Sequence, residues 1–389
     1  MNTKIGIGLI GAGWAAAIHA RGYQKAADLG ARVVAVAARH SESARAFAQR
    51  YDIPAAYDDP LSVVRSPDVD VVDLALPNVY HHSMAIAAAK AGKHVICEKP
   101  LTGYFGDGQT PRQEMLDQAL GNADAIIEAA EAHGVKVMYA ENLLYAPAVH
   151  KARQLIEASG GVLLDIRGEE SHSGSHAVYA KSWRESGGGS LLRLGTHPIG
   201  VALYLKHCEG LARNGSPILP VSVMAEVGAL TRIAAFQAED NPWIVKDWQD
   251  VEDWCCAIVT FSDGSRGTFI STDVLLGGMR DRLEFSLSNA HIICDLTHSG
   301  PIQAYAPDPT VFAQEYLAEK LETKAGWSFP HVDEEWALGY PQELGDFVQA
   351  VLEDRSPRST VELGRDVVNV IYSAYLSAAE GRRVHLQAG

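Results

Sequence analysis

Cysteines are scarce in the sequence and follow none of the patterns that build a structure. The five cysteines are odd in number, and none of them is spaced as C-x-x-C. From this pattern, neither a disulfide framework nor a zinc knuckle is expected. We therefore expect reduced, buried thiols, as in a cytoplasmic protein.

Long apolar runs and an excess of basic residues are also missing. No stretch of about 18 or more apolar residues occurs, so no membrane span is predicted. The first residues lack the pattern of a secretory signal, which favours a cytoplasmic location. Acidic residues outnumber basic ones by 48 to 33, for a formal net charge of −15. This charge disfavours a nucleic-acid or anionic-membrane partner, although a local pocket can still be positive.

The chain of 389 residues is longer than one core usually encloses and predicts two domains. In residues 1–143, short apolar segments alternate with helical patterns. Strands are expected at residues 4–10, 33–38, 69–76, 94–97 and 135–140. This alternation predicts an α/β chain whose first domain is a doubly wound parallel sheet of the Rossmann type.

In residues 144–389 the expected strands follow one another without helices between them. They are at residues 162–169, 222–229, 255–261, 267–272, 283–287 and 291–295. We therefore predict a second, α+β domain with a large, mainly antiparallel sheet, whose C-terminal helices could pack back on the first domain. A Gly- and Pro-rich insertion at residues 103–117 is expected to be a surface loop, with a lid or subunit contact as alternatives.

A glycine-rich turn follows the first expected strand. Gly11 allows the tight turn, Gly13 lets the backbone approach a ligand, and Ala16 keeps helix and strand close. The helix begins at Trp14 and Ala15, and its first N–H groups favour a pyrophosphate. The turn therefore predicts a dinucleotide site formed by Gly11, Gly13, Trp14 and Ala15.

The residues at the end of the second expected strand indicate which cofactor is preferred. An acid at this place would accept a hydrogen bond from the ribose 2′-hydroxyl of NAD, but the segment reads Ala38-Arg39-His40. Arg39 and His40 suit a 2′-phosphate, so NADP is favoured over NAD. Stacking of Arg39 on adenine, which either cofactor would allow, is the alternative.

Further candidate residues follow the third and fourth strands, at the edge where open α/β sheets bind ligands. Leu76, Asn78 and His81 come after the third strand and are expected to line the cofactor cleft. Glu98 and Lys99 come after the fourth. Lys99 could hydrogen-bond the reacting oxygen of an alcohol and remove its proton during hydride transfer.

A glycine triplet, residues 187–189, precedes Arg193 and His197 in the second domain. These two residues are spaced i and i+4 and share one helix face. Together with the turn at Gly11 and the Glu-Lys-Pro at Lys99, this motif resembles the Gfo/Idh/MocA oxidoreductases over essentially the whole chain. The resemblance implies a nicotinamide-dependent dehydrogenase of sugars or polyols, with His197 as an acid/base or sugar-orienting group. A buried structural histidine is the alternative for His197.

Three positions depart from that family. It usually has Asp in place of Arg193, commonly Asp in place of Gly200, and frequently Arg in place of Leu144. We expect Arg193 to hold an anionic group of the substrate. The alternatives are an ion pair with a local acid such as Glu169 or Glu170, or loss of the usual chemistry.

Other substrate contacts are expected from Tyr145, His172, His176 and Trp183. His172 and His176 could hold a metal with His197, but the Ser- and Gly-rich stretch between them indicates a loop. Hydrogen bonds to a sugar are therefore preferred, and no metal is predicted.

These motifs predict an NAD(P)-dependent oxidoreductase acting on a secondary alcohol of a sugar, sugar acid or polyol. The first alternative is a glycoside hydrolase that reduces a bound cofactor transiently, with no net redox change. A non-catalytic cofactor sensor is less favoured. The expected partners are a small sugar-like molecule and, by analogy with the family, further copies of the chain in a dimer or tetramer.

Overall fold

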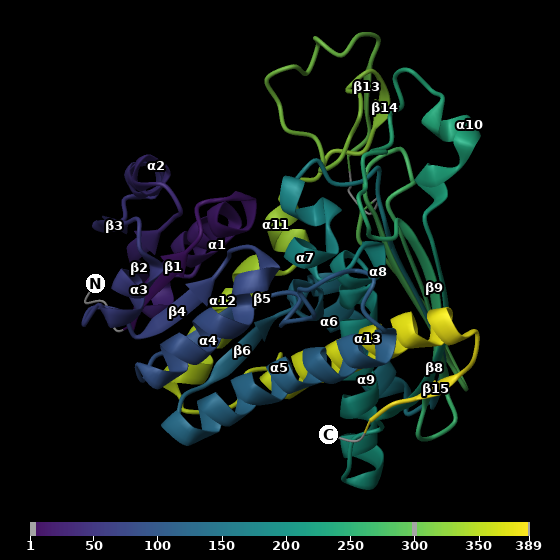
Figure 1. The fold of residues 1–389 in the computed structure, drawn as a ribbon, viewed down its shortest axis with the longest axis horizontal. Coiled ribbons are helices and arrows are strands. Elements are labelled where there is room, and N and C mark those ends of the chain that lie inside the picture. The colour runs from purple at the N-terminus through teal and green to yellow at the C-terminus, as the bar shows by residue number, and fades with distance from the viewer. Residues whose placement is uncertain (1–4, 298–301, 388–389) are drawn as a thin grey trace. The chain divides into compact units, whose positions relative to one another are not determined.

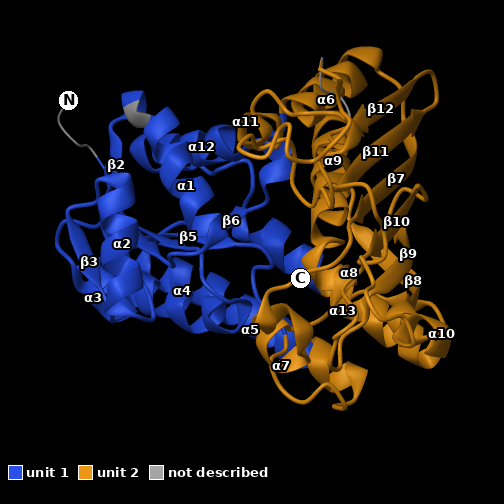
Figure 2. Ribbon diagram, turned by 90° about the horizontal axis from the view of Figure 1, so that it is seen from above, with its two compact units in different colours: residues 1–103, 117–146, 339–368 blue, residues 104–116, 147–338, 369–389 orange. Residues whose placement is uncertain are grey.

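The structure is a computed structural model that describes residues 5–297 and 302–387 (Figure 1). By its contacts the chain divides into two compact units (Figure 2). Unit 1 comprises residues 1–103, 117–146 and 339–368, and unit 2 comprises residues 104–116, 147–338 and 369–389. The division therefore differs from a single cut near residue 143: most of the insertion belongs to unit 2, and residues 339–368 return to unit 1.

Unit 1 is built on a six-stranded parallel sheet in the order β3-β2-β1-β4-β5-β6. The strands are β1 (Ile5–Ile10), β2 (Ala31–Ala37), β3 (Ala55–Tyr57), β4 (Val71–Leu74), β5 (His94–Glu98) and β6 (Val137–Ala140). The helices are α1 (Trp14–Lys25), α2 (Ser41–Tyr51), α3 (Pro60–Arg65), α4 (His81–Lys90), α5 (Arg112–His133) and α12 (Tyr340–Leu352). The predicted Rossmann-type sheet is confirmed. Its strand order reverses at β1, and ligands of such sheets bind beyond the carboxyl ends of the strands at this point.

The core of unit 1 explains why a distant segment returns to it. Every residue of β1 is buried, as expected for a central parallel strand with both faces covered. Helix α12 packs on α1 and buries Leu344, Phe347 and Val348. Because this apolar face needs a partner, residues 339–368 complete the helical layer of unit 1.

Unit 2 is built on a seven-stranded sheet in the order β12-β11-β7-β10-β9-β8-β15. The strands are β7 (Leu163–Ser171), β8 (Pro220–Gly228), β9 (Trp254–Phe261), β10 (Arg266–Thr272), β11 (Arg280–Leu287), β12 (His291–Asp295) and β15 (Val384–His385). The helices are α6 (Pro147–Ser159), α7 (Trp183–Ser186), α8 (Ser190–Arg193), α9 (Thr196–Asn214), α10 (Ala234–Gln237), α11 (Glu334–Ala337) and α13 (Val361–Glu380), which spans both units. The mainly antiparallel sheet was predicted, but the parallel pairing of β7 with β10 was not. This pair brings two carboxyl strand ends to one edge.

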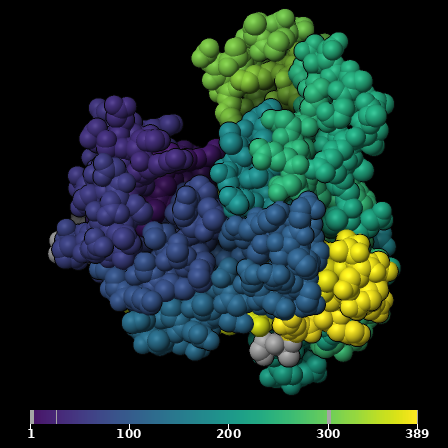
Figure 3. Space-filling view, viewed as in Figure 1, coloured from purple at the N-terminus to yellow at the C-terminus, as the bar shows by residue number. Residues whose placement is uncertain are grey.

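One face of the unit 2 sheet forms its core. In β9 the side chains of Cys255, Ala257 and Val259 are buried while that of Ile258 is exposed, the alternation expected of a half-buried strand. Between β12 and α12 the chain forms an arm, residues 302–337, with a short hairpin of β13 (Ala304–Ala306) and β14 (Gly326–Ser328). The arm lies on the surface, in light green in Figure 3. Among the described helices of both units, none is long and apolar enough to cross a membrane.

Candidate active site

The turn between β1 and α1 has the form that a dinucleotide requires. Gly11 has a φ of +129°, and a Cβ there would lie 1.9 Å from the carbonyl oxygen of Ala75, so only glycine fits. At Gly13 the space is open, with no described atom within 4 Å of a Cβ position. Among the described residues, no side chain caps the first N–H groups of α1, which begins with Trp14 and Ala15. An uncapped helix N-terminus facing open space fits pyrophosphate oxygens.

The residues expected to select the cofactor lie at the same sheet edge. Arg39 and His40 follow β2 directly and are exposed. His40 is the N-cap residue of α2, and its backbone is extended. The segment from Ala38 to Ser41 contains no acidic residue. Both side chains are therefore accessible to a ligand beyond the end of β2.

His81 braces the Glu-Lys-Pro segment. The ring is fully buried, with Nδ1 2.8 Å from the carbonyl oxygen of Pro100 and Nε2 3.0 Å from that of Leu76. Burial lowers the pKa of His81, so the neutral ring donates to one carbonyl at a time. The ring is enclosed between these two carbonyl groups, and its place in the wall of the cofactor cleft stays a prediction. Asn78, in the same turn, is also buried.

Lys99 follows β5 directly and is partly buried. The peptide bond between Lys99 and Pro100 is cis. The backbone N–H of Lys99 donates to Oε2 of Glu98 at 2.9 Å. Since β1 and β5 are parallel strands of one sheet, Lys99 lies at the same edge as the turn at Gly11, as predicted.

A buried ionic cluster lies behind Glu98. His19 of α1 places Nδ1 2.9 Å from Oδ2 of Asp73 and Nε2 3.0 Å from Oε1 of Glu98. The hydroxyl of Tyr23 donates to Asp73 at 2.7 Å. The imidazole of His19 thereby links the helix of the cofactor turn to the ends of β4 and β5. Sequence reasoning missed His19, because the helical pattern does not show which strand ends it faces.

The charge of His19 has a measurable consequence. Burial alone would lower its pKa, but the carboxylates of Asp73 and Glu98 outweigh burial and raise the pKa well above 6.5. A raised histidine pKa stabilises the fold below the unfolded-state value, and this contribution falls as the pH rises through the folded-state value.

We therefore expect His19→Gln to lower the melting temperature more at about pH 6 than at about pH 9, by about 3 °C or more, because the contribution of the imidazolium is largest at low pH. Thermal unfolding across this pH range measures the effect. His291→Gln, on the exposed face of β12, is the matched control and should show no such trend. An equal loss at both pH values would mean that His19 is not charged in the fold.

Three of the predicted site residues of unit 2, His172, Arg193 and His197, gather where β7 and β10 end. Because these strands run parallel, Glu170 and His172 come beside Asp273, and the N–H of His172 donates to the carbonyl of Thr272 at 3.0 Å. Helix α9 packs on both strands, and α8 packs on β10. The cluster is completed by Arg193 and by His197, which is itself buried.

Arg193 forms a buried ion pair with Asp273. Its guanidinium donates to the Asp273 carboxylate, and its Cζ lies 4.8 Å from the ring centroid of Trp248. Asp273 is fully buried, which raises its pKa, while Arg193 lowers it. Asp273 is therefore an acidic partner of Arg193 that was not expected beside Glu169 and Glu170. It could not be found from the sequence, because the pairing depends on the parallel register of β7 and β10.

The two histidines of this cluster have different partners. Nδ1 of His172 accepts the N–H of Gly174 at 2.9 Å, so a neutral His172 carries its proton on Nε2. Nε2 of His197 lies 3.8 Å from Oε2 of Glu170, and both side chains are buried. His197 is therefore placed beside a carboxylate that can orient it.

A second cation reaches this cluster from the arm. Lys320 donates to the carbonyl of Gly174 at 3.0 Å. Burial lowers the pKa of Lys320 and the charge of Arg193 lowers it further, while the charges of Glu319 and, more weakly, Asp273 oppose the change. Lys320 could not be found from the sequence, because it lies 47 residues or more from the other members of the cluster and belongs to no motif.

The remaining predicted substrate residues are Tyr145, Trp183 and His176, and their contact with a substrate stays a prediction. Tyr145 belongs to unit 1, where its hydroxyl donates to Asp346 at 2.8 Å. Trp183 is buried in unit 2 beneath the guanidinium of Arg112, 4.5 Å from its ring centroid. His176 is exposed. Within the described residues, no group of three His, Cys, Asp or Glu side chains is arranged to hold a metal.

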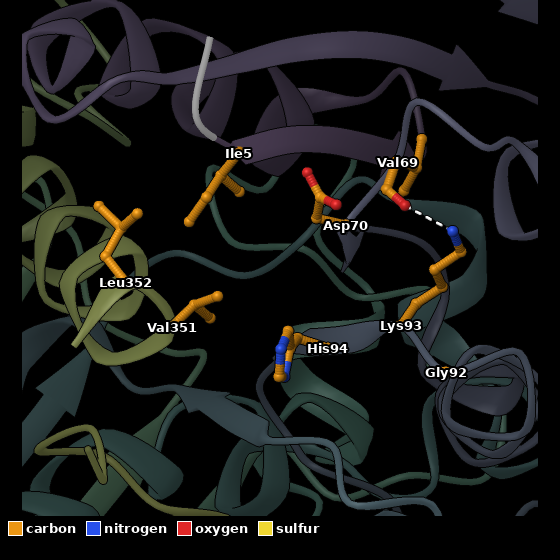
Figure 4. Close-up of a pocket in the computed structure, with 8 residues that line it drawn as sticks. All are labelled: Ile5, Val69, Asp70, Gly92, Lys93, His94, Val351 and Leu352. Carbon is orange, nitrogen blue, oxygen red and sulfur yellow. Dashed lines mark hydrogen bonds between the residues drawn. The ribbon is translucent and has the colours of Figure 1, made fainter. Parts of the chain in front are cut away.

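A cavity of about 360 Å³ in unit 1 lies at the opposite edge of the sheet, at the amino ends of β1, β4 and β5 (Figure 4). Its polar groups are engaged with the backbone. Asp70 accepts the N–H of Gly6 at 2.7 Å, and Lys93 donates to the carbonyl of Val69 at 2.6 Å. This cavity is therefore separate from the carboxyl edge and takes no part in the candidate site.

Family comparisons agree with this description over nearly the whole chain. A model of an oxidoreductase family with an NAD-binding Rossmann fold matches residues 5–141. A second model, of the C-terminal alpha/beta domain of such an oxidoreductase family, matches residues 154–386.

Two relatives that are named as dehydrogenases, and a solved structure of similar fold, agree with these family matches. Levoglucosan dehydrogenase of Pseudarthrobacter phenanthrenivorans is 31% identical over 284 residues, which are 69% of this chain and 67% of that protein. Trans-1,2-dihydrobenzene-1,2-diol dehydrogenase of Mus musculus is 32% identical over 169 residues, 43% of this chain and 46% of that protein. The crystal structure of GenD2 from gentamicin A biosynthesis in complex with NAD has a TM-score of 0.81 at 23% identity, covering 100% of this chain and 98% of that one. The matched stretch thus spans about two-thirds of the bacterial relative and less than half of the mouse relative.

Proposed function

Because the chain belongs to the Gfo/Idh/MocA oxidoreductase family, we propose that it transfers a hydride between a nicotinamide cofactor and a secondary alcohol of a sugar, sugar acid or polyol. The observation that carries this proposal is that one sheet edge of unit 1 bears both the uncapped turn at Gly11 and the side chain of Lys99. The names of two relatives, a levoglucosan dehydrogenase and a dihydrodiol dehydrogenase, support an alcohol as the reacting group.

The residues of unit 1 fit the cofactor. The N–H groups at the start of α1 would bind its pyrophosphate, with Gly13 leaving room for the phosphates. The bound nicotinamide would accept or donate the hydride. Lys99 would hold the reacting oxygen, take its proton during oxidation and return it during reduction. The bond from its N–H to Glu98, which His19 holds in turn, keeps the backbone of Lys99 in place.

We also propose that NADP binds more tightly than NAD, because Arg39 and His40 are exposed where a 2′-phosphate would lie. Calorimetry should give a dissociation constant for NADP at least about 10-fold lower than for NAD, and Arg39→Ala should remove most of this difference. Arg45→Ala, on the exposed face of α2, is the control and should keep it. Equal or tighter binding of NAD by the wild type would refute the preference and leave Arg39 as a stacking residue.

The charges of unit 2 support an anionic substrate. Arg193 donates to the buried carboxylate of Asp273, and Lys320, a second cation, is affected by the charges of Glu319, Arg193 and Asp273. A substrate carboxylate, sulfonate or phosphate could pair with the planar guanidinium of Arg193. By its resemblance to the family, His197 would act as acid/base or orient the sugar. The number of copies in the assembly stays a prediction.

A further inference from the structure

Glu252 binds three consecutive N–H groups at the start of α8. It lies in the loop before β9 and is 7% exposed. Its carboxylate accepts the N–H groups of Gly189 and Leu191, each at 3.0 Å. Its backbone carbonyl accepts the N–H of Ser190 at 3.1 Å. These N–H groups have no partner within the helix, so one residue satisfies the first turn of α8.

The fit around Glu252 is tight and involves a second element. A Cβ at Gly189 would lie 1.8 Å from the carbonyl oxygen of Glu252, which explains the last glycine of the triplet. Tyr375 of α13 donates its hydroxyl to Glu252 at 2.8 Å. The ring of Tyr375 packs against Trp183, with centroids 4.9 Å apart. The carboxylate of Glu252 is therefore held in one orientation.

The position of residues 189–191 is passed on to the substrate cluster through the backbone. The N–H of Arg193 donates to the carbonyl of Gly189 at 3.0 Å, and that of Leu194 donates to Ser190 at 2.9 Å. The N–H of His197 donates to Leu194 at 3.1 Å. A continuous series of short-range backbone hydrogen bonds thus connects residues 189–191, which Glu252 holds, to Arg193 and His197.

Glu252 and Tyr375 line a cavity of about 210 Å³ in unit 2. The titratable and charged groups that face Glu252 are Tyr372 and Tyr375 from α13, Arg193 from α8, Cys255 from β9, and Arg112, Arg232 and Asp250 around the cavity. Burial raises the pKa of Glu252 to about 7, against the opposing effect of Tyr375 and the N–H groups. Protonation would remove part of its acceptor capacity.

We propose that Glu252 is a positioning residue of the reaction: its carboxylate holds residues 189–191 and thereby sets where Arg193 and His197 lie. This rests on the proposed function, since a position matters here only if these two side chains meet a substrate. It extends that function by adding a group outside the substrate cluster that controls it.

The test compares Glu252→Gln with Glu209→Gln. Glu209 is an equally buried carboxylate of unit 2 that accepts a backbone N–H, that of Leu163 at 2.9 Å, but it does not contact α8. Hydrogen–deuterium exchange of the segment 187–198 should rise at least about 10-fold in Glu252→Gln and stay unchanged in Glu209→Gln. For an alcohol that the wild type oxidises, kcat/KM should fall at least about 10-fold in Glu252→Gln, with the cofactor dissociation constant unchanged. An ionisation near neutral pH in the wild-type kcat/KM profile should disappear.

The outcomes separate the two proposals. Faster exchange with normal kcat/KM would make Glu252 a structural residue and overturn the inference, as would unchanged exchange. If the wild type oxidises no alcohol, the proposed function fails by itself. The NMR-detected pKa of the His197 imidazole, assigned with His197→Gln, then decides the inference: a shift in Glu252→Gln supports it, and no shift overturns it.

Discussion

Replacing Lys99 with alanine should lower kcat at least about 100-fold while the cofactor dissociation constant stays within a few-fold of the wild-type value. The reason is positional. Lys99 is at the carboxyl end of β5, and its backbone N–H is bound to Glu98. Its side chain is the group at this edge that we assign to the alcohol proton, so its loss should affect the chemical step and spare the turn at Gly11. Steady-state kinetics and calorimetry measure the two quantities.

Lys90→Ala is the matched control, because Lys90 ends α4 in the same unit and is exposed. It should change neither quantity. If Lys99→Ala abolishes cofactor binding and changes nothing else, Lys99 is a cofactor ligand. His197 would then be the next candidate for the proton step.

Replacing Arg193 with alanine should raise KM for an acidic sugar about 10- to 150-fold and leave KM for its neutral parent nearly unchanged, because a desolvated charge-assisted hydrogen bond contributes about 1.5–3 kcal/mol. The measurement is a paired screen of sugar acids and their neutral parents. Lys320→Met should act in the same direction, because Lys320 is the second cation near Asp273.

Because Arg193 also forms an ion pair with Asp273, the test with Arg193→Ala needs a second variant. Removing Arg193 takes away the guanidinium that donates to the buried Asp273 carboxylate, and breaking a buried ion pair typically costs about 3–5 kcal/mol of stability. Arg193→Ala combined with Asp273→Asn removes this penalty. The double variant should regain thermal stability without regaining affinity for the acidic sugar. If it regains both, or if the wild type prefers neutral sugars, Arg193 is only the structural partner of Asp273.

Local sequence patterns were sufficient to predict most of the fold. Apolar segments alternating with helices predicted the parallel sheet of unit 1, because each signal lies within about ten residues of sequence. The six strands expected in the second domain all occur, at slightly shifted bounds. The parallel register of β7 with β10 and the joining of most of the insertion to unit 2 could not be predicted. Each depends on packing between distant segments.

The same reason separates the site residues that were found from those that were missed. Gly11, Lys99 and His197 are parts of short motifs, so the sequence could indicate them. His19 and Asp273 have no motif, and their roles arise only when two strand ends and a helix meet. Tyr145 was expected to bind substrate, which stays a prediction, and the structure adds a hydrogen bond from its hydroxyl to Asp346 inside unit 1. A local pattern does not show which face of a segment is enclosed.

The central claim is net hydride transfer, and one assay tests it most directly. Purified protein is mixed with NADP or NAD and a panel of sugars, sugar acids, polyols and glycosides, and both reduced cofactor and organic product are quantified. We expect one reduced cofactor for each oxidised alcohol, with acidic sugars as the preferred substrates. Cleavage of a glycoside with no accumulation of reduced cofactor would contradict the account and identify a redox-neutral hydrolase instead.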